Sequence, residues 1–438
     1  ENIVISTGTS SGKSLCYGIP ILNQQLNQPG ATSLLLFPTK ALTNDQYNNF
    51  ADYAEQLPGG NIKPAIYDGD TPNHQRSAMR KSATILMTNP DMLHQGILPH
   101  HTNWARFFSN LRFVVIDEIH IYRGVFGSHF ANLMRRLKRI CAFYNAYPQF
   151  VLTSATIGNP EELAASLIEQ KVHLIDEDGS PKGPAHFLVY NPPLVDEKLG
   201  IRKSSIDFGV TFAQKLMHAN HQSLVFARTR RTVEMLLTYL RHRLPIQEQN
   251  AVRGYRSGYL KYERREIEQG LKSGSVRAVF STSALELGVD IGDLDAVILV
   301  GFPGTIATAR QRIGRAGRKQ QPSLGIMIAT NEAMDQYLAA HPEYLVDRNP
   351  EQELIDPQNL VILLQHIGCA AFELPFSRSE GFGSMNPEEL ARFLDLLEQS
   401  GSLTRQGEEY YWLADRYPAA EVSLRSSTPN VVSLNVVE

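Results

Sequence analysis

The sequence predicts an α/β fold of two doubly wound parallel-sheet domains, followed by a small α+β domain. Three observations support this prediction. Short apolar runs alternate with helical patterns through most of the chain. A segment rich in glycine, proline and charge, 176–193, divides this alternating part and indicates an interdomain linker. After about residue 345 the alternation stops. We therefore expect domains over 1–184, 185–345 and 346–438, the last of them truncated.

The bulk composition is that of a globular protein with more than one core. The chain has 438 residues, of which 42% are hydrophobic and 20% charged, and this length divides into two or three domains. The net charge of −3 gives no global basic signature, although a local groove can still be basic. No apolar run approaches the ~20 residues of a membrane span, and no signal peptide is visible, so we expect no membrane partner.

Three cysteines are too few and too dispersed for a disulfide framework or a metal site. Cys16, Cys141 and Cys369 lie far apart and lack ligand spacing. We expect buried thiols in a reducing compartment, and hence a cytoplasmic protein.

The apolar runs predict the buried strands of the two sheets. Runs this apolar, separated by helical patterns, are typical of parallel strands covered on both faces. The expected strands are 3–5, 34–37, 84–87, 113–116 and 150–152 in the first half, and 223–227, 278–281, 296–300 and 326–329 in the second.

The C-terminal part predicts a helix followed by a hairpin. Asn386 can cap a helix that has Pro387 at its first position and acids in its first turn, and Gly401 can end it. Strand patterns over 402–405 and 409–413 flank a Gln-Gly turn. A helix before a hairpin favours a winged helix. A small α+β packing module is the alternative.

A phosphate loop follows the first expected strand. Backbone N–H groups at the start of the next helix suit phosphate oxygens. Lys13 would reach the β- and γ-phosphates and Ser14 would bind Mg²⁺, so ATP and Mg²⁺ are the expected cofactors. The usual G-x-x-x-x-G-K-[S/T] pattern fails at its first position, and a chance Gly-Lys-Ser is the alternative. The loop consists of Thr7, Gly8, Thr9, Ser10, Ser11, Gly12, Lys13 and Ser14.

Asp117 and Glu118 end the expected strand 113–116, at the edge of a parallel sheet where ligands gather. Asp117 can hold Mg²⁺ through water, and Glu118 can orient and deprotonate an attacking water. They could instead be surface carboxylates, which a phosphate loop in the same sheet disfavours. His120 could couple this site to Ser154-Ala155-Thr156 or satisfy a local hydrogen bond.

Two arginines in the second half lie in a glycine-punctuated turn that we expect to enter a helix. Arg315 and Arg318 could stabilise the charge on a transferring phosphoryl group once the two domains close. The alternative is binding to a nucleic acid backbone, which also favours arginine.

Taken in order, these segments resemble the motifs of superfamily 2 helicases. The superfamily's form of the phosphate loop accounts for the missing first glycine, although Ser10 stands where a glycine is usual. The resemblance covers about residues 1–345. The matching segments are 7–14, 38–42, 88–91, 117–120, 154–156, 226–229, 282–290 and 311–318.

Finer features resemble the MrfA/YprA and Hrq-type branch of bacterial and fungal DNA repair helicases, which is related to the RecQ group. These features are the segments 119–129, 255–259, 263–268 and 281–292. The resemblance implies movement from 3′ to 5′ on DNA, in the bacterial cytoplasm or nucleoid, and a four-cysteine zinc domain. The three cysteines cannot build that domain. Since the phosphate loop begins almost at Glu1, we expect an excerpt that lacks an adenine-binding segment.

The resemblance also implies site residues in two RecA-like domains with Mg-ATP between them. Gly288 and Asp290 would lie near the ribose and phosphates, and Gln311 near the γ-phosphate. Single-stranded or tailed duplex DNA would cross both domains. The same motifs would also fit an RNA helicase, a translocase that does not separate strands, or a non-catalytic scaffold. The strand would contact Thr39, Lys40, Thr88, Arg228, Arg256 and Thr282.

Overall fold

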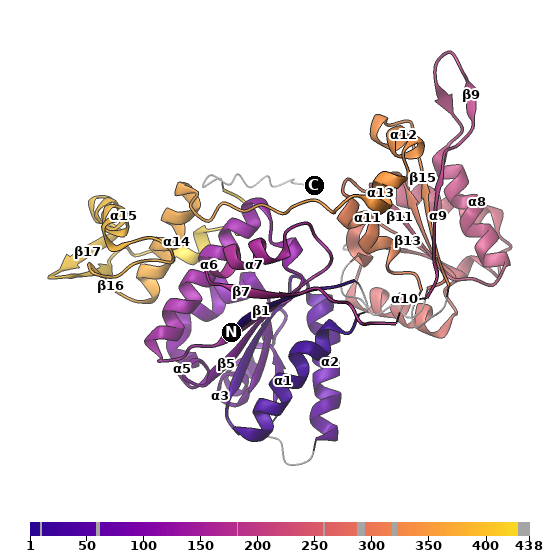
Figure 1. Ribbon diagram of the computed structural model, residues 1–438. Coiled ribbons are helices and arrows are strands. Elements are labelled where there is room, and N and C mark those ends of the chain that lie inside the picture. Colours follow the sequence, from indigo (N-terminus) through magenta and orange to yellow (C-terminus); the bar gives the residue numbers. More distant parts are fainter. Residues whose placement is uncertain are drawn as a thin grey trace, which may run out of the picture.

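The structure is a computed structural model that describes residues 1–8, 11–57, 62–181, 183–256, 259–286, 294–317 and 322–427. Two parallel sheets, each flanked by helices, lie side by side, and a smaller helix-and-hairpin module lies against the first (Figure 1). The two predicted parallel-sheet α/β domains are confirmed. No helix among the described residues is long and apolar enough to cross a membrane.

The first sheet has seven parallel strands in the order β3-β4-β2-β5-β6-β1-β7. The five predicted runs are its central strands. The two edge strands, β3 and β7, were not predicted, because they are short and β3 begins at a proline. The strands are β1 Asn2–Ser6, β2 Thr32–Leu36, β3 Pro64–Ile66, β4 Ile85–Thr88, β5 Leu111–Ile116, β6 Gln149–Ser154 and β7 Val172–Ile175.

Helices cover both faces of this sheet and bury two apolar clusters against it. One helix, α6, is buried along most of its length, because the sheet lies on one side of it and the C-terminal module on another. The helices are α1 Lys13–Asn27, α2 Lys40–Gln56, α3 Asn73–Ser82, α4 Pro90–Met92, η1 Leu93–Ile97, η2 Leu98–Trp104, α5 Ala105–Ser109, η3 Ile119–Ile121, α6 Gly124–Phe143 and α7 Pro160–Ile168.

The second sheet has six parallel strands in the order β12-β13-β11-β14-β15-β8. Its edge strand β8 falls inside 176–193, so the expected linker is shorter than predicted. The strands are β8 Ala185–Tyr190, β11 Ser223–Ala227, β12 Val252–Tyr255, β13 Ala278–Ser281, β14 Ala296–Val300 and β15 Ser323–Ile328. The helices are α8 Ser205–His218, α9 Arg230–Arg243, η4 Gln249–Ala251, α10 Lys261–Ser273, η5 Ser283–Leu285, α11 Ile306–Ile313, α12 Ala333–Ala340 and α13 Glu343–Asp347.

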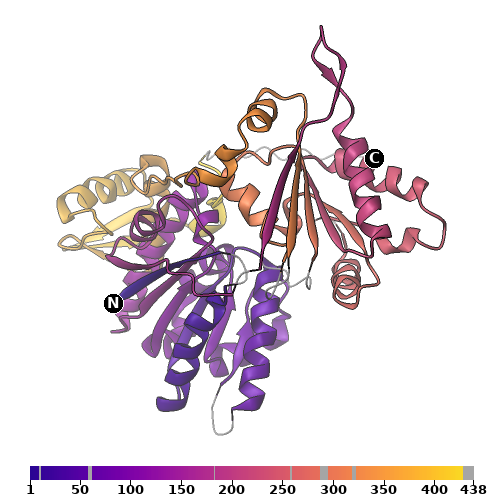
Figure 2. The same cartoon turned by 45° about the vertical axis from the view of Figure 1, so that its right-hand side comes forward.

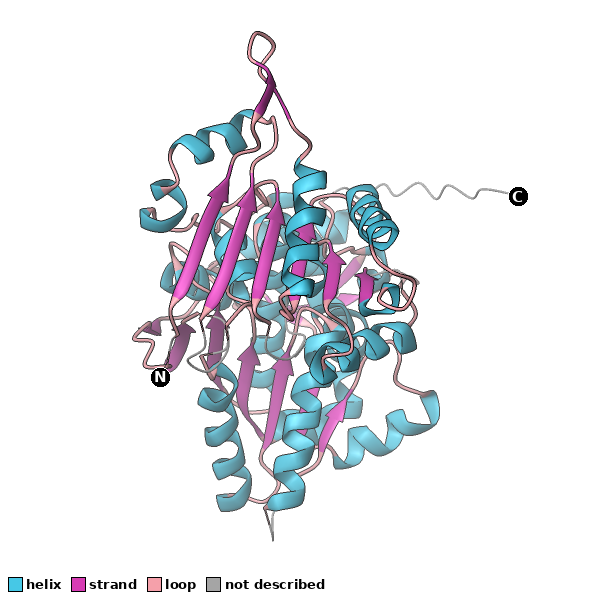
Figure 3. Cartoon of the chain, turned by 90° about the vertical axis from the view of Figure 1, so that its right-hand side faces the viewer, coloured by secondary structure: helices cyan, strands magenta, loops and turns pink. Residues whose placement is uncertain are grey.

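A two-stranded hairpin extends from the carboxyl end of β8. It consists of β9, Leu194–Asp196, and β10, Ile201–Arg202. All three views show it standing clear of the rest of the second domain (Figures 1, 2 and 3). Because every strand of the sheet is parallel, the hairpin leaves the same edge at which β11, β12 and β13 end.

The C-terminal module contains the predicted helix and hairpin. Asn386 accepts a hydrogen bond from the Glu389 N–H (2.9 Å) and donates its own N–H to the Glu389 carboxylate (3.2 Å), which is a capping box. Gly401 ends the helix region with a φ of 74°. The elements are α14 Leu360–Glu373, β16 Phe376–Ser377, α15 Pro387–Gln399, β17 Leu403–Gln406, β18 Glu409–Trp412 and α16 Pro418–Glu421.

This module docks on the first domain through a buried ion pair. Arg136 on α6 pairs with Glu373 at the end of α14, and both side chains are essentially inaccessible to solvent. The same guanidinium lies 2.7 Å from Nδ1 of His94 and 3.3 Å from Nδ1 of His366. Burial and the nearby Arg136 charge lower the pKa of both imidazoles, to about 3 for His94. The network is therefore neutral apart from one charge pair.

The cysteine prediction was right for two residues and wrong for one. Cys141 and Cys369 are buried, and burial raises the pKa of each thiol to about 12. Cys16 is exposed, because it lies on the solvent side of the first turns of α1.

We expect Arg136→Ala to lower the free energy of unfolding by about 3–5 kcal/mol, because the Glu373 carboxylate would be left buried without a counter-charge. Urea denaturation compares the variant with Arg243→Ala, which breaks an exposed pair with Asp207 and should cost below about 1 kcal/mol. Equal effects of the two variants would contradict the docking role. The double variant Arg136→Leu/Glu373→Leu should recover stability, since it leaves no unpaired charge.

Candidate functional site

The phosphate loop lies at the carboxyl edge of the first sheet and is closed by its own lysine. Lys13 Nζ donates to the carbonyl oxygens of Thr7 (3.0 Å) and Gly8 (2.7 Å). The Ser11 hydroxyl donates to the Gly8 carbonyl (2.9 Å). Gly12 has a φ of 82°, a left-handed conformation that glycine adopts without steric cost. The ammonium therefore lies in the hollow of the loop, where phosphate oxygens could replace the carbonyls.

Two other residues of the loop, Thr9 and Ser10, lie outside the described residues. Ser14 is half-buried in the first turn of α1. Its position next to Lys13 is the one that a hydroxyl ligand of Mg²⁺ requires. No group of three His, Cys, Asp or Glu side chains in the described ranges is arranged for a metal ion.

Asp117 follows β5 directly and is buried. Its N–H donates to the Leu36 carbonyl (3.0 Å), and the Thr153 hydroxyl donates to its carboxylate. Burial raises the pKa of Asp117 to about 7, and the neighbouring Glu118 charge adds to the rise, while the Thr153 hydrogen bond and the Lys13 charge oppose it. A carboxylate in such a place is stabilised by a bound cation.

Glu118 has a φ of 54° and a ψ of 53°, which is a strained conformation for a residue with a side chain. Its N–H donates to Oγ1 of Thr153 (3.3 Å). Within the part of the chain that the structure describes, its Oε2 is buried and has no hydrogen-bond partner. A buried carboxylate oxygen without a donor is costly, so this atom is placed to accept a proton or a hydrogen bond from a bound water.

His120 lies between the two domains. Its Nδ1 accepts from the Ala155 N–H (3.3 Å) and is 3.4 Å from the Glu118 carboxylate. Its Nε2 lies 3.2 Å from the side-chain amide nitrogen of Gln311 on α11. Burial lowers the pKa of His120, although the Glu118 charge opposes this. The imidazole thus contacts three of the predicted elements: Glu118, the segment 154–156 and α11.

The other members of that segment differ in accessibility. The Ser154 hydroxyl is buried and has no hydrogen-bond partner among the described residues, whereas Thr156 is exposed. Thr156, His120 and Gln311 line a cavity of about 180 Å³ between the domains. Of the predicted coupling residues, His120 and Thr156 therefore lie at the boundary between the two domains, and Ser154 is buried behind them in the first.

The arginine-rich run lies at the end of a helix, which corrects the prediction of a turn entering one. α11 ends at Ile313, so Arg315 follows it and donates to the Glu286 carbonyl (2.7 Å). Arg312, which was not predicted, pairs with the Glu286 carboxylate (2.7 Å) and packs over the Phe226 ring. Nothing in the sequence separated this buried arginine from its neighbours. Arg318, Gly288 and Asp290 lie outside the described residues.

Sequence reasoning also missed a strap, residues 350–358, that joins the domains. The Glu351 carboxylate accepts from the N–H groups of Ile306 (2.7 Å) and Ala307 (3.1 Å) at the start of α11. Its backbone carbonyl accepts from the Gly158 N–H (3.1 Å) in the first domain. A Cβ at Gly158 would lie 2.6 Å from the Pro350 carbonyl oxygen, so only glycine admits the strap. A cap supplied from this far along the chain leaves no local sequence signal.

In the first domain, the residues predicted to contact the DNA strand differ in how accessible their side chains are to solvent. Thr39 caps α2 by accepting from the Leu42 N–H (3.3 Å). Lys40 is exposed and pairs with Asp70 (2.8 Å). Thr88 is fully buried, and its hydroxyl donates to the Tyr67 carbonyl (2.6 Å). Its side chain is therefore not available to a strand, and the prediction of a contact through this hydroxyl is corrected.

In the second domain, the predicted contacts follow three neighbouring strands. Arg228 follows β11 and pairs with Glu332. Arg256 follows β12, pairs with Glu234 (3.1 Å) and stacks over the Tyr259 ring. Thr282 follows β13 and is half-buried. All three lie at one edge of the sheet. The arginine pairs are half-exposed, so a phosphate could compete for each guanidinium.

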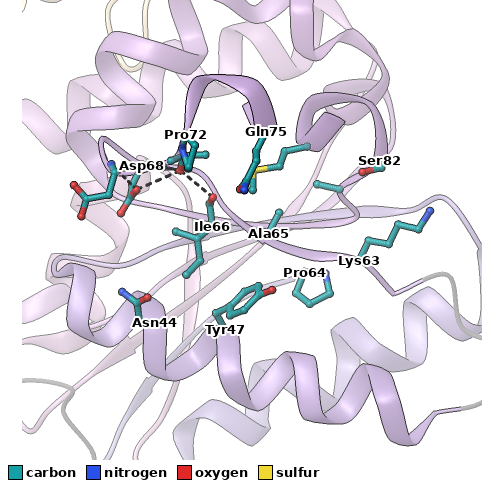
Figure 4. A pocket seen from close by; sticks show the side chains of 14 residues that line it. Asn44, Tyr47, Lys63, Pro64, Ala65, Ile66, Asp68, Pro72, Gln75 and Ser82 are labelled. Carbon is teal, nitrogen blue, oxygen red and sulfur yellow. Dashed lines mark hydrogen bonds between the residues drawn. The ribbon is translucent and has the colours of Figure 1, made fainter. Parts of the chain in front are cut away.

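A second hollow, of about 320 Å³, lies beside the edge strand β3 (Figure 4). The Thr71 hydroxyl donates to the Ile66 carbonyl (3.1 Å) at its margin, and Tyr47 and Gln75 line it. None of the predicted site residues lines it.

Three protein families match most of the chain. The DEAD/DEAH box helicase family matches residues 1–163. The helicase conserved C-terminal domain matches residues 210–320. The winged helix domain of the ATP-dependent helicase HRQ1 matches residues 355–427, which confirms the winged-helix prediction over the packing-module alternative.

Individual relatives agree with these families. YprA of Bacillus subtilis, described as an uncharacterised ATP-dependent helicase, is 48% identical over 99% of this chain and 57% of its own length. The ATP-dependent helicase HRQ1 of Saccharomyces cerevisiae is 42% identical over 86% of this chain and 36% of its own. The crystal structure of the helicase MrfA bound to DNA and AMPPNP has a TM-score of 0.92 and 47% identity over 97% of this chain and 59% of its own. The chain thus spans roughly half the length of these relatives.

The raised pKa of Asp117 predicts a pH-dependent stability. The folded protein keeps a proton on this carboxyl that the unfolded chain loses above its pKa of 3.8, so the group destabilises the fold as pH rises from about 4 to about 7. Over this window the stability of the free protein should fall by roughly 4 kcal/mol relative to Asp117→Asn, at about 1.4 kcal/mol per pKa unit. Urea denaturation of both proteins across this range measures it, and parallel pH profiles would rule it out.

Proposed function

The chain belongs to the superfamily 2 helicases of the MrfA, YprA and Hrq type, and we propose that it is the motor of an ATP-dependent DNA helicase. The observation that carries the proposal is the contact across the domain boundary. Gln311 of the second domain touches His120, which lies in the same turn as Asp117 and Glu118. Two domains that meet at a hydrolytic site can convert its chemistry into relative motion.

The first-domain residues fit Mg-ATP. Lys13 and the N–H groups around it would hold the β- and γ-phosphates, while Ser14 and Asp117 would hold Mg²⁺, Asp117 through water. The bound nucleotide supplies a phosphoryl group for transfer to water. Glu118 would orient that water through Oε2, which accepts no hydrogen bond from the described residues and lies 3.4 Å from His120 Nδ1, and would accept its proton. A water-excluding, preorganised carboxylate of this kind lowers the barrier to attack.

The second domain would complete the site when the cleft closes. Arg315 and Arg318 would then stabilise charge on the γ-phosphate, and Gly288 and Asp290 would lie near the ribose and phosphates. Closure requires Arg315 to leave the Glu286 carbonyl that it contacts here. Glu351 would couple the movement of α11 to that of the loop after 154–156, because it ties the start of α11 to this loop. His120, Ser154 and Thr156 would transmit conformational changes at the ATP site to the second domain.

A single DNA strand would cross both domains at the edge formed by Thr39 and Lys40 in the first and by Arg228, Arg256 and Thr282 in the second. Contacts of this type bind the phosphate backbone and give affinity without sequence reading. The MrfA structure with DNA and AMPPNP supports DNA as the partner. Movement from 3′ to 5′ and a role in DNA repair in the bacterial cytoplasm or nucleoid are further proposals, for which the family resemblance is the support.

The test is steady-state ATP hydrolysis by the full-length protein without nucleic acid, with single-stranded DNA and with RNA of the same sequence. We expect DNA to stimulate strongly and RNA weakly. Lys13→Ala should abolish the stimulated activity because the phosphates lose their cation. Equal stimulation by both strands would favour an RNA helicase, since a site that ignores the 2′-OH does not discriminate. Stimulated hydrolysis by Lys13→Ala would refute the phosphate-loop assignment.

We expect Glu118→Gln to bind ATP and single-stranded DNA with wild-type affinity but to lower kcat by about 100-fold or more, which is the usual contribution of a general base. Nucleotide binding by calorimetry and turnover by phosphate release separate the two effects. Wild-type turnover in this variant would remove Glu118 from the role. A matched control is Glu55→Gln, an exposed acid on α2 outside the hydrolytic site, which should leave kcat near the wild-type value.

A further inference from the structure

The β9–β10 hairpin, residues 194–202, is a preformed projection. The Asp196 carboxylate accepts from the N–H groups of Lys198 (2.9 Å) and Leu199 (3.1 Å), which shapes the tip. Gly200 has a φ of 65°, so the turn closes at a residue that tolerates this conformation. At the base, Arg202 donates to the Pro192 carbonyl (2.8 Å) and the Lys203 N–H donates to the Pro193 carbonyl (3.0 Å). Hydrogen bonds at both ends hold it as a rigid finger.

The finger exposes several apolar side chains to solvent. Leu199 is 72% exposed and Val195 66% exposed, and Ile201 and Leu194 near them are also exposed. Single exposed apolar residues need no explanation, but four of them on a nine-residue projection mark a surface that a ligand covers. Glu197 and Lys198 are both exposed at the tip between them, so charges of both signs lie beside the apolar side chains.

The finger leaves the sheet at the edge that we propose binds the DNA strand. The finger leaves β8, and Arg228 follows β11, at the same edge of one parallel sheet. β8 is three strands from β11 in the sheet order, or about 14 Å at a spacing of ~4.8 Å per strand. That distance corresponds to about four base-pair rises of ~3.4 Å. A strand held at Arg228 would therefore reach the base of the finger within a few nucleotides.

We propose that this finger is the wedge that separates the two strands of duplex DNA as the motor pulls one of them. Val195 and Leu199 pack against the exposed face of the first base pair at the junction. Apolar wedges that insert at base steps in this way offset a few kcal/mol of lost stacking. This inference rests on the proposed function, because it needs a DNA motor to drive the junction onto the finger.

The test uses the full-length protein with Val195→Ser and Leu199→Ser combined. Both side chains are exposed, so the fold should be unaffected, and an unchanged thermal midpoint checks this. The matched control is Ile246→Ser, an equally apolar residue that is 81% exposed and precedes β12, at the opposite edge of the same sheet. Three activities are compared: ATP hydrolysis with single-stranded DNA, displacement of streptavidin from a biotinylated single strand, and unwinding of tailed duplexes.

We expect the double variant to unwind at least about tenfold more slowly, equivalent to ~1.4 kcal/mol of lost junction melting, with hydrolysis and streptavidin displacement within about twofold of wild type. The Ile246→Ser variant should match wild type in all three. Unwinding that is unchanged, or that falls only in step with hydrolysis, would overturn the wedge. If the wild-type protein itself displaces streptavidin but unwinds no tailed duplex, the wedge alone is overturned, whereas absence of DNA-stimulated hydrolysis in the wild-type protein would remove the motor as well.

A fluorescent base at the junction tests the wedge directly. 2-Aminopurine at the first base pair should brighten when the wild-type protein binds a tailed duplex with a non-hydrolysable ATP analogue, and should stay dark with the double variant. Brightening of equal size in both proteins would mean that another segment opens the pair. If the finger instead binds a protein, the double variant would keep wild-type unwinding, which again counts against the wedge.

Discussion

The parallel arrangement of strands in both sheets is the constraint on which the rest of this molecule depends. In a parallel sheet the carboxyl ends of all strands lie at one edge. Residues that follow different strands, and are distant in sequence, therefore lie close together at that edge. In the first sheet this brings Lys13, Asp117 and Ser154 to one edge, and in the second Arg228 and Thr282. The connecting helices cover both faces and exclude water from the strands, which gives the edge residues a rigid base.

The chemistry of the first-domain edge comes from polar groups that the fold keeps unsatisfied or strained. Burial raises the pKa of Asp117, and repulsion by the neighbouring Glu118 carboxylate adds to the rise. Glu118 has a left-handed backbone, and its Oε2 finds no donor in the described structure. Such features cost stability and persist where the surrounding structure over-determines them. Here the surrounding sheet and the Thr153 side chain hold the turn, and a bound cation and water would relieve the cost.

Among the described residues, few hydrogen bonds cross the boundary between the domains. Gln311 meets His120, and Glu351 links α11 to Gly158. Small polar interfaces of this kind permit domain motion, whereas large apolar ones prevent it. The winged-helix module is fixed differently, because its buried Arg136–Glu373 pair ties it to α6. The first domain and the module therefore form one body, and the second domain is connected to it through the strap.

The sequence by itself determined the class of fold, the central strands, the C-terminal helix with its capping box, and the phosphate loop and acidic turn. All of these are encoded by local pattern: apolar runs, cap residues and residues at strand ends. Only the tertiary structure decided the edge strands β3, β7 and β8, the exposure of Cys16, the burial of Thr88 and the cap that Glu351 provides. It also decided that the module docks on α6 and that the hairpin stands in solvent. These outcomes depend on which residues that are distant in sequence come into contact in the fold. A local sequence pattern does not contain this information, because it describes only residues that are close together along the chain.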